Sequence, residues 1–245
     1  MVYSQESSTK KDNLLKDGKK EKTSTGHRAR VKEKFNKQDI STFSNLELIE
    51  ALLFFCNARR DVKPEAKELN KISGGNMLKF LFLTEEEIKS NDIKYIGDNL
   101  LFLNKIILEL TARFFKDKIT EFTFKNLDDI KNYLITRSGF LSKEELRVLY
   151  LNSKNKLIDD SVVSRGTINE TAIYIREVVS LALKKTAMSI IISHNHPSGD
   201  ISPSREDIKV TYDLKQALES VSIKLQDHII TSGTCYFSFK KEGLL

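Results

Sequence analysis

The pattern of apolar and polar positions divides the chain into three stretches. Residues 1–25 are rich in lysine, serine and threonine and have almost no large apolar side chains, so they bury too little surface to offset the entropy of ordering. From 26 to 118, apolar residues recur with helical spacing, and from 122 to 245 strand-like runs alternate with helical ones. We predict a disordered basic tail, a small helical domain and an α/β domain.

The helical domain contains two sequence signatures of a helix start. Ser44 with Glu47, and Thr84 with Glu87, have the spacing of a capping box, in which serine or threonine and glutamate satisfy free backbone N–H groups. A longer apolar pattern covers about 98–115. We predict a small all-α bundle of four or five helices.

The turn at 93–99 in this domain resembles the hairpin of a helix-hairpin-helix module. Such hairpins carry two glycines around an aliphatic residue, which lets backbone amides approach a DNA phosphate. Tyr95 replaces the first glycine here, and only Gly97 remains. A tyrosine side chain obstructs that approach, so we prefer a plain turn between helices and keep DNA binding through a degenerate hairpin as the alternative.

Short strand-like and helix-like runs follow from residue 122 onward. Residues 188–193 are almost wholly apolar, which is typical of a strand buried on both faces. We predict an α/β fold with a central sheet and flanking helices. The predicted strands are 144–151, 157–166, 188–193, 223–231 and 235–239, and the predicted helices are 127–139, 170–185 and 205–221.

Two of the four histidines stand one residue apart directly after the apolar run. In a strand, His194 and His196 face the same side. Pro197 then ends the strand, and Asp207 is far enough along for a loop and one helical turn to return its carboxylate to the same point. Two imidazoles, one carboxylate and an open fourth position are typical of catalytic zinc. We therefore predict that His194, His196 and Asp207 bind one Zn²⁺ ion.

A structural interpretation of the same stretch stays open. Ser204 is a good helix N-cap, and Asp207 is an acid in the first turn, where the helix dipole favours it. The N-H-P-S-G string is also typical of a turn. We favour the metal site because these features coincide with two histidines at a strand end.

Charge and cysteine content change the picture little. The formal charge is +6, and the first 40 residues alone carry nine lysines and two arginines against six acids. Such a tail can contact nucleic acid through phosphates, but we prefer a solvated tail. Cys56 and Cys235 give no disulfide framework and fit a reducing compartment. With no apolar run of about 18 residues and no leader pattern, we expect a soluble, cytoplasmic protein without a membrane partner.

The string H-N-H-P-S-G-D-I-S-P-S-R-E-D, residues 194–207, resembles a known signature. It matches H-x-H-P-x6-S-x2-D of the JAB/MPN (JAMM) metalloprotease superfamily at every fixed position, and its fuller form looks like the RadC branch. The resemblance covers about 27–245. It implies a cytidine-deaminase-like JAB/MPN domain at 122–245, with a central mixed sheet and flanking helices, after a helical domain at 26–118.

The resemblance also implies roles for individual residues. His194, His196 and Asp207 would bind zinc, and Ser204 would hydrogen-bond the developing oxyanion. A glutamate at the start of an upstream strand serves as general base in the superfamily, and Glu144 is in that position. Glu145, which would face the opposite side, is the second choice. Glu177 is a third candidate, in a helical context unlike that of the family.

The chain departs from the RadC pattern at a few positions. The helix before the metal strand starts with Tyr174-Ile175-Arg176-Glu177 where His-Pro-Arg-Glu is usual, and Asn152 replaces an aspartate. These departures, with Tyr95, put family-specific partners in doubt but leave the metal motif intact. His228 lies in a predicted strand, and we expect it to be structural or solvent-facing and not a fourth ligand.

Two functions follow as hypotheses. The first is a zinc-dependent hydrolase, a metallopeptidase or isopeptidase acting on a peptide or protein substrate. The alternative is a DNA-repair-associated nucleic-acid-binding protein with a structural or vestigial metal site. The complete set of Glu144, His194, His196, Ser204 and Asp207 favours the enzyme, and the incomplete glycine hairpin disfavours DNA contact. An inactive scaffold with the same fold is a weaker third hypothesis.

Overall fold

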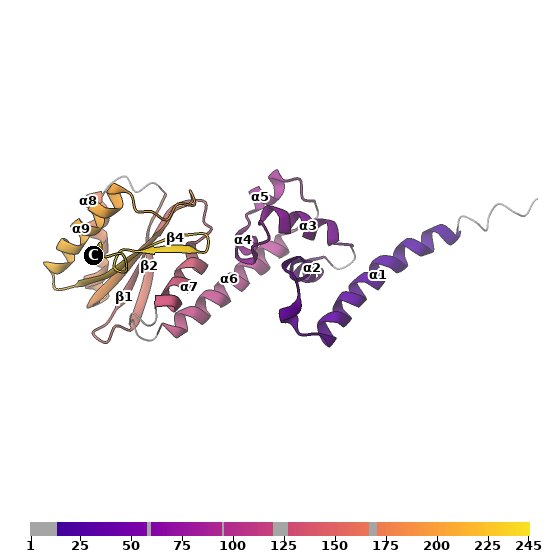
Figure 1. Cartoon of the computed structure of the whole chain (residues 1–245), viewed down its shortest axis with the longest axis horizontal. Helices are drawn as coiled ribbons and strands as arrows, with labels where there is room; N and C mark the ends of the chain where they lie inside the picture. The colour runs from indigo at the N-terminus through magenta and orange to yellow at the C-terminus, as the bar shows by residue number, and fades with distance from the viewer. Residues whose placement is uncertain (1–13, 58–59, 95, 120–126, 167–170) are drawn as a thin grey trace, which may run out of the picture. The chain divides into compact units, whose positions relative to one another are not determined.

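The computed structural model describes residues 14–57, 60–94, 96–119, 127–166 and 171–245 (Figure 1). The chain forms two compact units, Met1–Asn104 and Lys105–Leu245. No helix within those described ranges is long and apolar enough to cross a bilayer.

The first unit is all helical. Its elements are α1 (Leu14–Lys37), a 3-10 helix (Ile40–Thr42), α2 (Asn45–Cys56), α3 (Lys63–Ile72), α4 (Met77–Phe82), α5 (Glu85–Ser90) and the beginning of α6 (Asp98–Lys118). Fully buried Ile49, Leu53, Leu69 and Phe80 form the centre of its core. Both predicted capping boxes are present, at the start of α2 and at the start of α5.

Helix α1 extends into the segment predicted as a tail. It begins at Leu14, so residues 14–25 are helical, while residues 1–13 lie outside the described part. A helix satisfies its backbone hydrogen bonds internally, so a lack of apolar residues does not prevent it from forming. Its later turns are attached to α2, where His27 Nε2 lies 2.5 Å from Glu50 Oε1 and Arg28 donates to the Phe54 carbonyl at 2.9 Å.

The predicted hairpin connects α5 to α6. Helix α5 ends at Ser90 and α6 begins at Asp98, so an inter-helix turn lies where the sequence places one. Tyr95, on which the DNA-binding alternative depends, is outside the described residues. DNA binding by this turn therefore stays an untested alternative.

The boundary between the units falls inside α6, between Asn104 and Lys105, and not after residue 118, where the predicted helical domain ends. Leu100 is buried in the core of the first unit. Ala112, three turns further along the same helix, is buried in a core of the second unit, and Phe115 packs against that core. The apolar pattern of α6 is continuous, so the sequence gives no sign of this change.

The second unit has a five-stranded mixed sheet with helices on both faces, as predicted. Its elements after α6 are α7 (Leu127–Ser138), β1 (Glu145–Leu151), β2 (Leu157–Arg165), α8 (Thr171–Lys184), β3 (Ser189–Asn195), α9 (Arg205–Glu219), β4 (Lys224–Ser232) and β5 (Cys235–Ser238). The strand order is β2-β1-β3-β4-β5, and only β3 and β4 pair in parallel. A parallel pair needs a crossover connection, and α9 supplies it.

Alternate residues of the central strands face two separate cores. Val148, Tyr150, Ile190 and Ile192 pack with α8 and α9 on one face (Figure 1). On the other face, Leu149, Leu151 and Ile191 pack with α7 and the end of α6. Every residue of β3 is buried, the three isoleucines as well as Ser189, Ser193, His194 and Asn195, as expected of a central strand covered on both faces. This alternation decides which face the polar residues beyond the strand ends occupy.

Candidate metal centre

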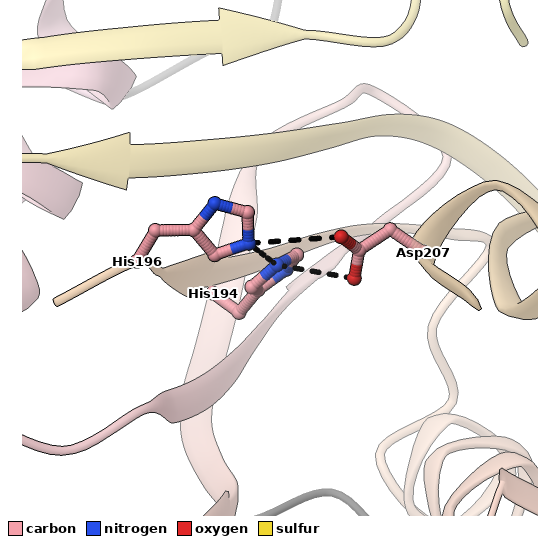
Figure 2. A group of neighbouring side chains, drawn as sticks. All are labelled: His194, His196 and Asp207. Carbon is pink, nitrogen blue, oxygen red and sulfur yellow. Dashed lines mark hydrogen bonds and ion pairs between the residues drawn. The ribbon is translucent and has the colours of Figure 1, made fainter. Parts of the chain in front are cut away.

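His194, His196 and Asp207 come together at the end of β3 (Figure 2). Each contributes one ligand atom, and these atoms lie within 4.8 Å of one another. The two Nε2 atoms are 2.9 Å apart. Asp207 Oδ1 lies 3.3 Å from His194 Nε2, and Oδ2 lies 3.6 Å from His196 Nε2. The sequence prediction named these three residues, and the fold brings them to one point.

Strand β3 places both imidazoles on the same face. The strand ends at Asn195, two residues later than predicted, so His194 belongs to it. The backbone N–H of His196 still donates to the Thr231 carbonyl of β4 at 2.8 Å. The alternation of the strand therefore continues through His196, and both rings extend the face of Ile190 and Ile192.

The hydrogen bonds of His194 and His228 fix where their protons lie. The Thr211 hydroxyl donates to the backbone carbonyl of Asp207 at 2.6 Å, so it accepts at its 2.6 Å contact with His228 Nδ1. His228 Nδ1 thus carries the proton, and its Nε2 accepts from His194 Nδ1 at 2.9 Å. His194 Nε2 is then unprotonated and has a lone pair available, and it is the atom that faces Asp207.

The same reasoning applies to His196. Its Nδ1 lies 2.7 Å from the carbonyl oxygen of Asp200. A carbonyl only accepts, so Nδ1 is the donor, and in the neutral imidazole Nε2 is a lone pair. Hydrogen bonds that hold the remote nitrogen and free the other one are typical of metal-binding histidines.

The carboxylate of Asp207 has one oxygen engaged and one directed at the histidines. Oδ2 accepts from the backbone N–H of Ser204 at 2.8 Å and from its hydroxyl at 2.7 Å. Oδ1 faces His194 Nε2. The lone pairs of two nitrogens and a carboxylate oxygen therefore face one another with no hydrogen atom between them. A bound cation would attract all three atoms and offset their mutual repulsion. The donor set of two imidazoles and one carboxylate fits a divalent metal ion.

Burial keeps the two innermost imidazoles neutral. It lowers the pKa of His194 to about 4, against an opposing attraction from Asp207 and a further repulsion from His196. Burial, with repulsion from His194 and His196, also holds the pKa of His228 well below its ordinary value. A metal ligand must be unprotonated, so burial prepares His194 for that role around neutral pH.

Ser204 is the N-cap of α9. Its hydroxyl donates to Asp207 Oδ2 and accepts from the Asp207 N–H at 3.0 Å, which completes a capping box. The structural interpretation that the sequence left open is thus the arrangement seen here. The capping box also fixes the carboxylate of Asp207, which is one of the three candidate metal-binding residues.

Glu145, the second choice for a general base, lies on the opposite face from the histidines. It is 5% exposed, and its carboxylate accepts from Arg147 at 2.8 Å and from Arg165 at 3.1 Å. Leu146, the next residue, pairs with His194 and packs with α8 and α9. Glu145 is therefore part of an ion-pair network on the opposite face from the candidate metal centre.

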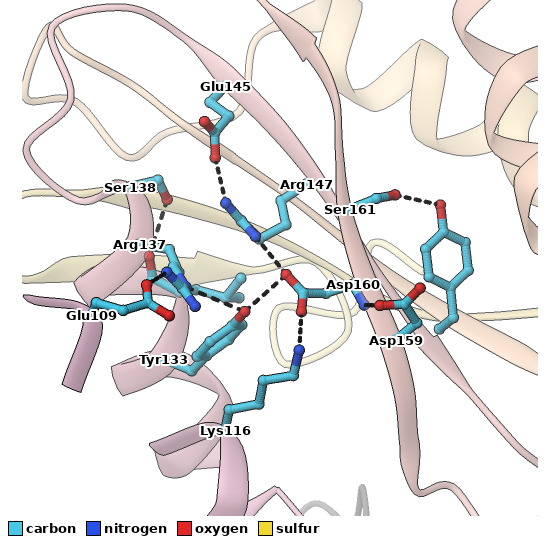
Figure 3. A network of polar contacts seen from close by, with 12 residues as sticks. Glu109, Lys116, Tyr133, Arg137, Ser138, Glu145, Arg147, Asp159, Asp160 and Ser161 are labelled. Carbon is cyan, nitrogen blue, oxygen red and sulfur yellow. Dashed lines mark hydrogen bonds and ion pairs between the residues drawn. The ribbon is translucent and has the colours of Figure 1, made fainter. Parts of the chain in front are cut away.

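That network is built around Asp160 (Figure 3). Asp160 accepts from Lys116 at 2.5 Å, from Tyr133 at 2.8 Å and from Arg147 at 2.5 Å. Burial raises the pKa of Asp160, but the hydrogen bonds from Lys116 and Tyr133 together with the charges of Arg147 and Lys116 outweigh it, so the net shift is downward. The network ties α6 and α7 to the β1–β2 hairpin.

Glu144 is on the same face as the histidines. Its carbonyl accepts from the Gly166 N–H at 2.8 Å, which extends the β1–β2 ladder by one pair beyond Glu145 and Arg165. Glu144 and Leu146 therefore share a face, and Leu146 is the partner of His194. Glu177, the third candidate, is an exposed residue of α8 and not one of the three clustered metal-site residues.

Sequence reasoning missed the role of two residues behind the centre. His228 is 2% exposed, stacks on Phe239 at 4.5 Å and contacts His194, so of the two expectations the structural one is correct and the solvent-facing one is wrong. Thr211 was not singled out. The sequence feature that could have identified it is a polar residue one turn after Asp207, on the buried face of α9 that continues with Leu214 and Leu218.

Residues 124–244 match the family described as RadC-like JAB domain. The chain is also similar to UPF0758 protein FN0909 of Fusobacterium nucleatum subsp. nucleatum, with 37% identity over 235 residues, which are 92% of this chain and 99% of the relative. UPF0758 protein SPO0054 of Ruegeria pomeroyi is 33% identical over 220 residues, 89% of this chain and 97% of that protein.

Proposed function

This chain belongs to the family of RadC-like JAB domain proteins, and on that premise we propose that it is a zinc-dependent hydrolase of the JAMM type. Its reaction is the cleavage of an amide bond in a peptide or protein substrate. The observation that carries the proposal is the convergence of His194 Nε2, His196 Nε2 and Asp207 Oδ1 on one point. Hydrogen bonds that hold the remote nitrogen of each histidine and direct the other nitrogen to a common point are typical of metal-binding histidines.

His194, His196 and Asp207 would hold the ion. Three protein ligands leave a fourth position open, which distinguishes catalytic from structural sites. A zinc ion held there would supply Lewis acidity and would lower the pKa of a bound water to about 7.

Glu144 is the proposed general base. Its position on the face of His194 and His196, at the end of the extended β1–β2 ladder, supports this assignment. Glu144 is partly exposed, whereas Glu145 is buried and paired with two arginines. A carboxylate at this end of β1 would accept a proton and return it to the leaving amine.

Ser204 is proposed to donate a hydrogen bond to the developing oxyanion. Its hydroxyl is exposed at the N-terminus of α9 and adjoins the Asp207 carboxylate. The role requires the hydroxyl to turn from Asp207 Oδ2 to the substrate. The backbone N–H of Ser204 continues to hold Oδ2 at 2.8 Å, so the ligand stays in place during that turn.

Metal analysis of the purified protein tests the metal part of this proposal. We expect one zinc per chain, measured by inductively coupled plasma mass spectrometry, and its loss in His194→Ala and Asp207→Asn. His27→Ala, which alters a histidine of the first unit paired with Glu50, is the control and keeps one ion. A wild-type protein without zinc, or with iron in its place, would overturn the proposal.

Hydrolysis is tested separately. The zinc-loaded protein is incubated with a peptide library and with a proteome digest, and new termini are identified by mass spectrometry. Cleavage is expected with the wild type and not with Asp207→Asn or the metal-free protein. Cleavage that persists in Asp207→Asn would assign the activity to a contaminant.

A further inference from the structure

The asparagine between the two histidines contacts the segment that carries Glu144. Asn195 is fully buried at the end of β3. Its Oδ1 accepts from the backbone N–H of Glu145 at 2.8 Å. Its Nδ2 donates to the carbonyl of Lys143 at 3.1 Å and is 3.4 Å from that of Leu141. A single side chain therefore contacts three backbone groups of the approach to β1.

The chemistry of the partners fixes the orientation of the amide. A backbone N–H only donates, so the oxygen of Asn195 must face Glu145, and backbone carbonyls only accept, so the nitrogen must face Leu141 and Lys143. Neither aspartate nor leucine, the two residues closest to asparagine in shape, makes both contacts. The position thus requires an acceptor and a donor on one planar group.

These contacts begin where the backbone ladder ends. Pairing between β1 and β3 runs from Leu151 with Ser189 to Leu146 with His194 and stops there. Beyond that pair, the side chain of Asn195 binds the Glu145 N–H in place of a backbone carbonyl. The connection between the two strands is thereby extended past the last ladder pair.

The groups that Asn195 holds lie on both sides of Glu144. The Lys143 carbonyl precedes it, the Glu145 N–H follows it, and Gly166 holds the carbonyl of Glu144 itself. Asn195 is covalently flanked by His194 and His196. The backbone of Glu144 is therefore tied through one side chain to the strand that carries two of the three ligand residues.

We propose that Asn195 is a positioning residue that sets the location of Glu144 relative to the metal ligands. The inference rests on the proposed role of Glu144 as base. It explains why a buried amide stands between the two histidines, on the face that does not bind metal. Base and ligands then keep a constant separation, which proton transfer requires because it occurs within hydrogen-bond reach.

The variants are Asn195→Ala and Asn195→Ser, of which the second keeps a small polar group if the first fails to fold. Glu144→Gln and the double variant Asn195→Ser/Glu144→Gln complete a cycle. The control is Asn104→Ala, because Asn104 is also buried and also donates to a backbone carbonyl, that of Phe80, but in the first unit. All are full-length chains loaded with cobalt(II).

Three measurements are made on each variant. Hydrogen exchange followed by mass spectrometry reports on residues 141–147. Chelator competition gives the cobalt affinity. The pH dependence of the cobalt d–d absorption reports on ionisations at the metal centre.

We expect exchange in 141–147 to accelerate about tenfold in both Asn195 variants, as for the loss of two buried hydrogen bonds, with cobalt affinity within about threefold of wild type. The pH midpoint of the absorption should shift as in Glu144→Gln, and the double variant should match Glu144→Gln. Asn104→Ala should change none of the three.

Unchanged exchange in 141–147 would overturn the contact itself. Faster exchange with a wild-type pH midpoint, while Glu144→Gln shifts it, would overturn the positioning role and leave Glu144 as base. If Glu144→Gln leaves the pH midpoint unchanged, both the role of Glu144 as base and the positioning role of Asn195 are overturned. Loss of cobalt from the Asn195 variants alone would show that Asn195 acts on the ligands.

Discussion

His194 Nδ1 lies 2.9 Å from His228 Nε2, and through His228 and Thr211 it is connected back to the carbonyl of Asp207. Two of the three residues that could hold a metal ion, which come from different elements, are thus joined by a chain of three hydrogen bonds. The direction of each bond follows from the Thr211 hydroxyl, which has one proton to give. The chain leaves His194 Nε2 unprotonated.

Removal of the Thr211 hydroxyl should weaken metal binding. In Thr211→Val the His228 Nδ1–H loses its acceptor, so His228 no longer favours the tautomer that accepts from His194. We expect a loss of about 10- to 100-fold in zinc affinity, the usual effect of an outer-shell change, measured by competition with a chromogenic chelator. Thr136→Val is the control, because Thr136 is also buried and donates to the carbonyl four residues earlier, on α7. Equal losses of zinc affinity in Thr211→Val and Thr136→Val would contradict a specific effect of the hydrogen bond between Thr211 and His228.

Glu144 and Glu145 should respond differently to the same substitution. Glu144→Gln removes the proposed base, so hydrolysis should fall by about 10²- to 10⁴-fold with zinc retained. Glu145→Gln removes the charge that pairs with Arg147 and Arg165, so it should lower the free energy of unfolding by about 3 kcal/mol. Urea denaturation and zinc analysis separate the two. The opposite result would assign the base to Glu145.

The metal-free protein should lose stability as the pH falls from about 6.5 to about 4. The pKa of His194 is about 4 in the folded state against 6.5 for the free side chain, so within this window the unfolded chain binds a proton that the folded protein does not. Unfolding is then favoured as the pH falls, by about 3 kcal/mol in total. The pKa of His228 is lowered as well, which acts in the same direction. His194→Asn should flatten the dependence in urea unfolding series, and an identical slope would refute this origin.

Gly139 should not tolerate a side chain. A Cβ at this position would lie 2.3 Å from the Gly233 carbonyl oxygen and 2.8 Å from that of Ile135. Gly139→Ala should therefore lower the free energy of unfolding by about 2 kcal/mol or more, as for overpacked sites. Gly97→Ala is the control, since its Cβ meets no atom within 4 Å. Thermal unfolding of the two variants measures the difference, and equal melting temperatures would be inconsistent with the close contact.

The order of elements in the second unit could be predicted from the sequence because its periodicities are strong and local. The apolar run before His194, the capping residues at Ser204 and the spacing of the three ligands depend only on nearby residues. The α/β class and the clustering of His194, His196 and Asp207 were therefore within reach of the sequence. The domain boundary was not, because the apolar stripe of α6 is continuous while its two ends belong to different cores.

Other features depend on contacts between residues far apart in the chain. Adjacent glutamates are equivalent in a sequence, and only the pairing of Leu146 with His194 places Glu144 on the face of the histidines and Glu145 among arginines. The direction of the bond between His194 and His228 depends in the same way on Thr211, a residue of another element. The sequence determined which side chains are available for metal chemistry. Tertiary structure decided their faces and proton positions, because strand register and hydrogen-bond direction are properties of pairs and not of single residues.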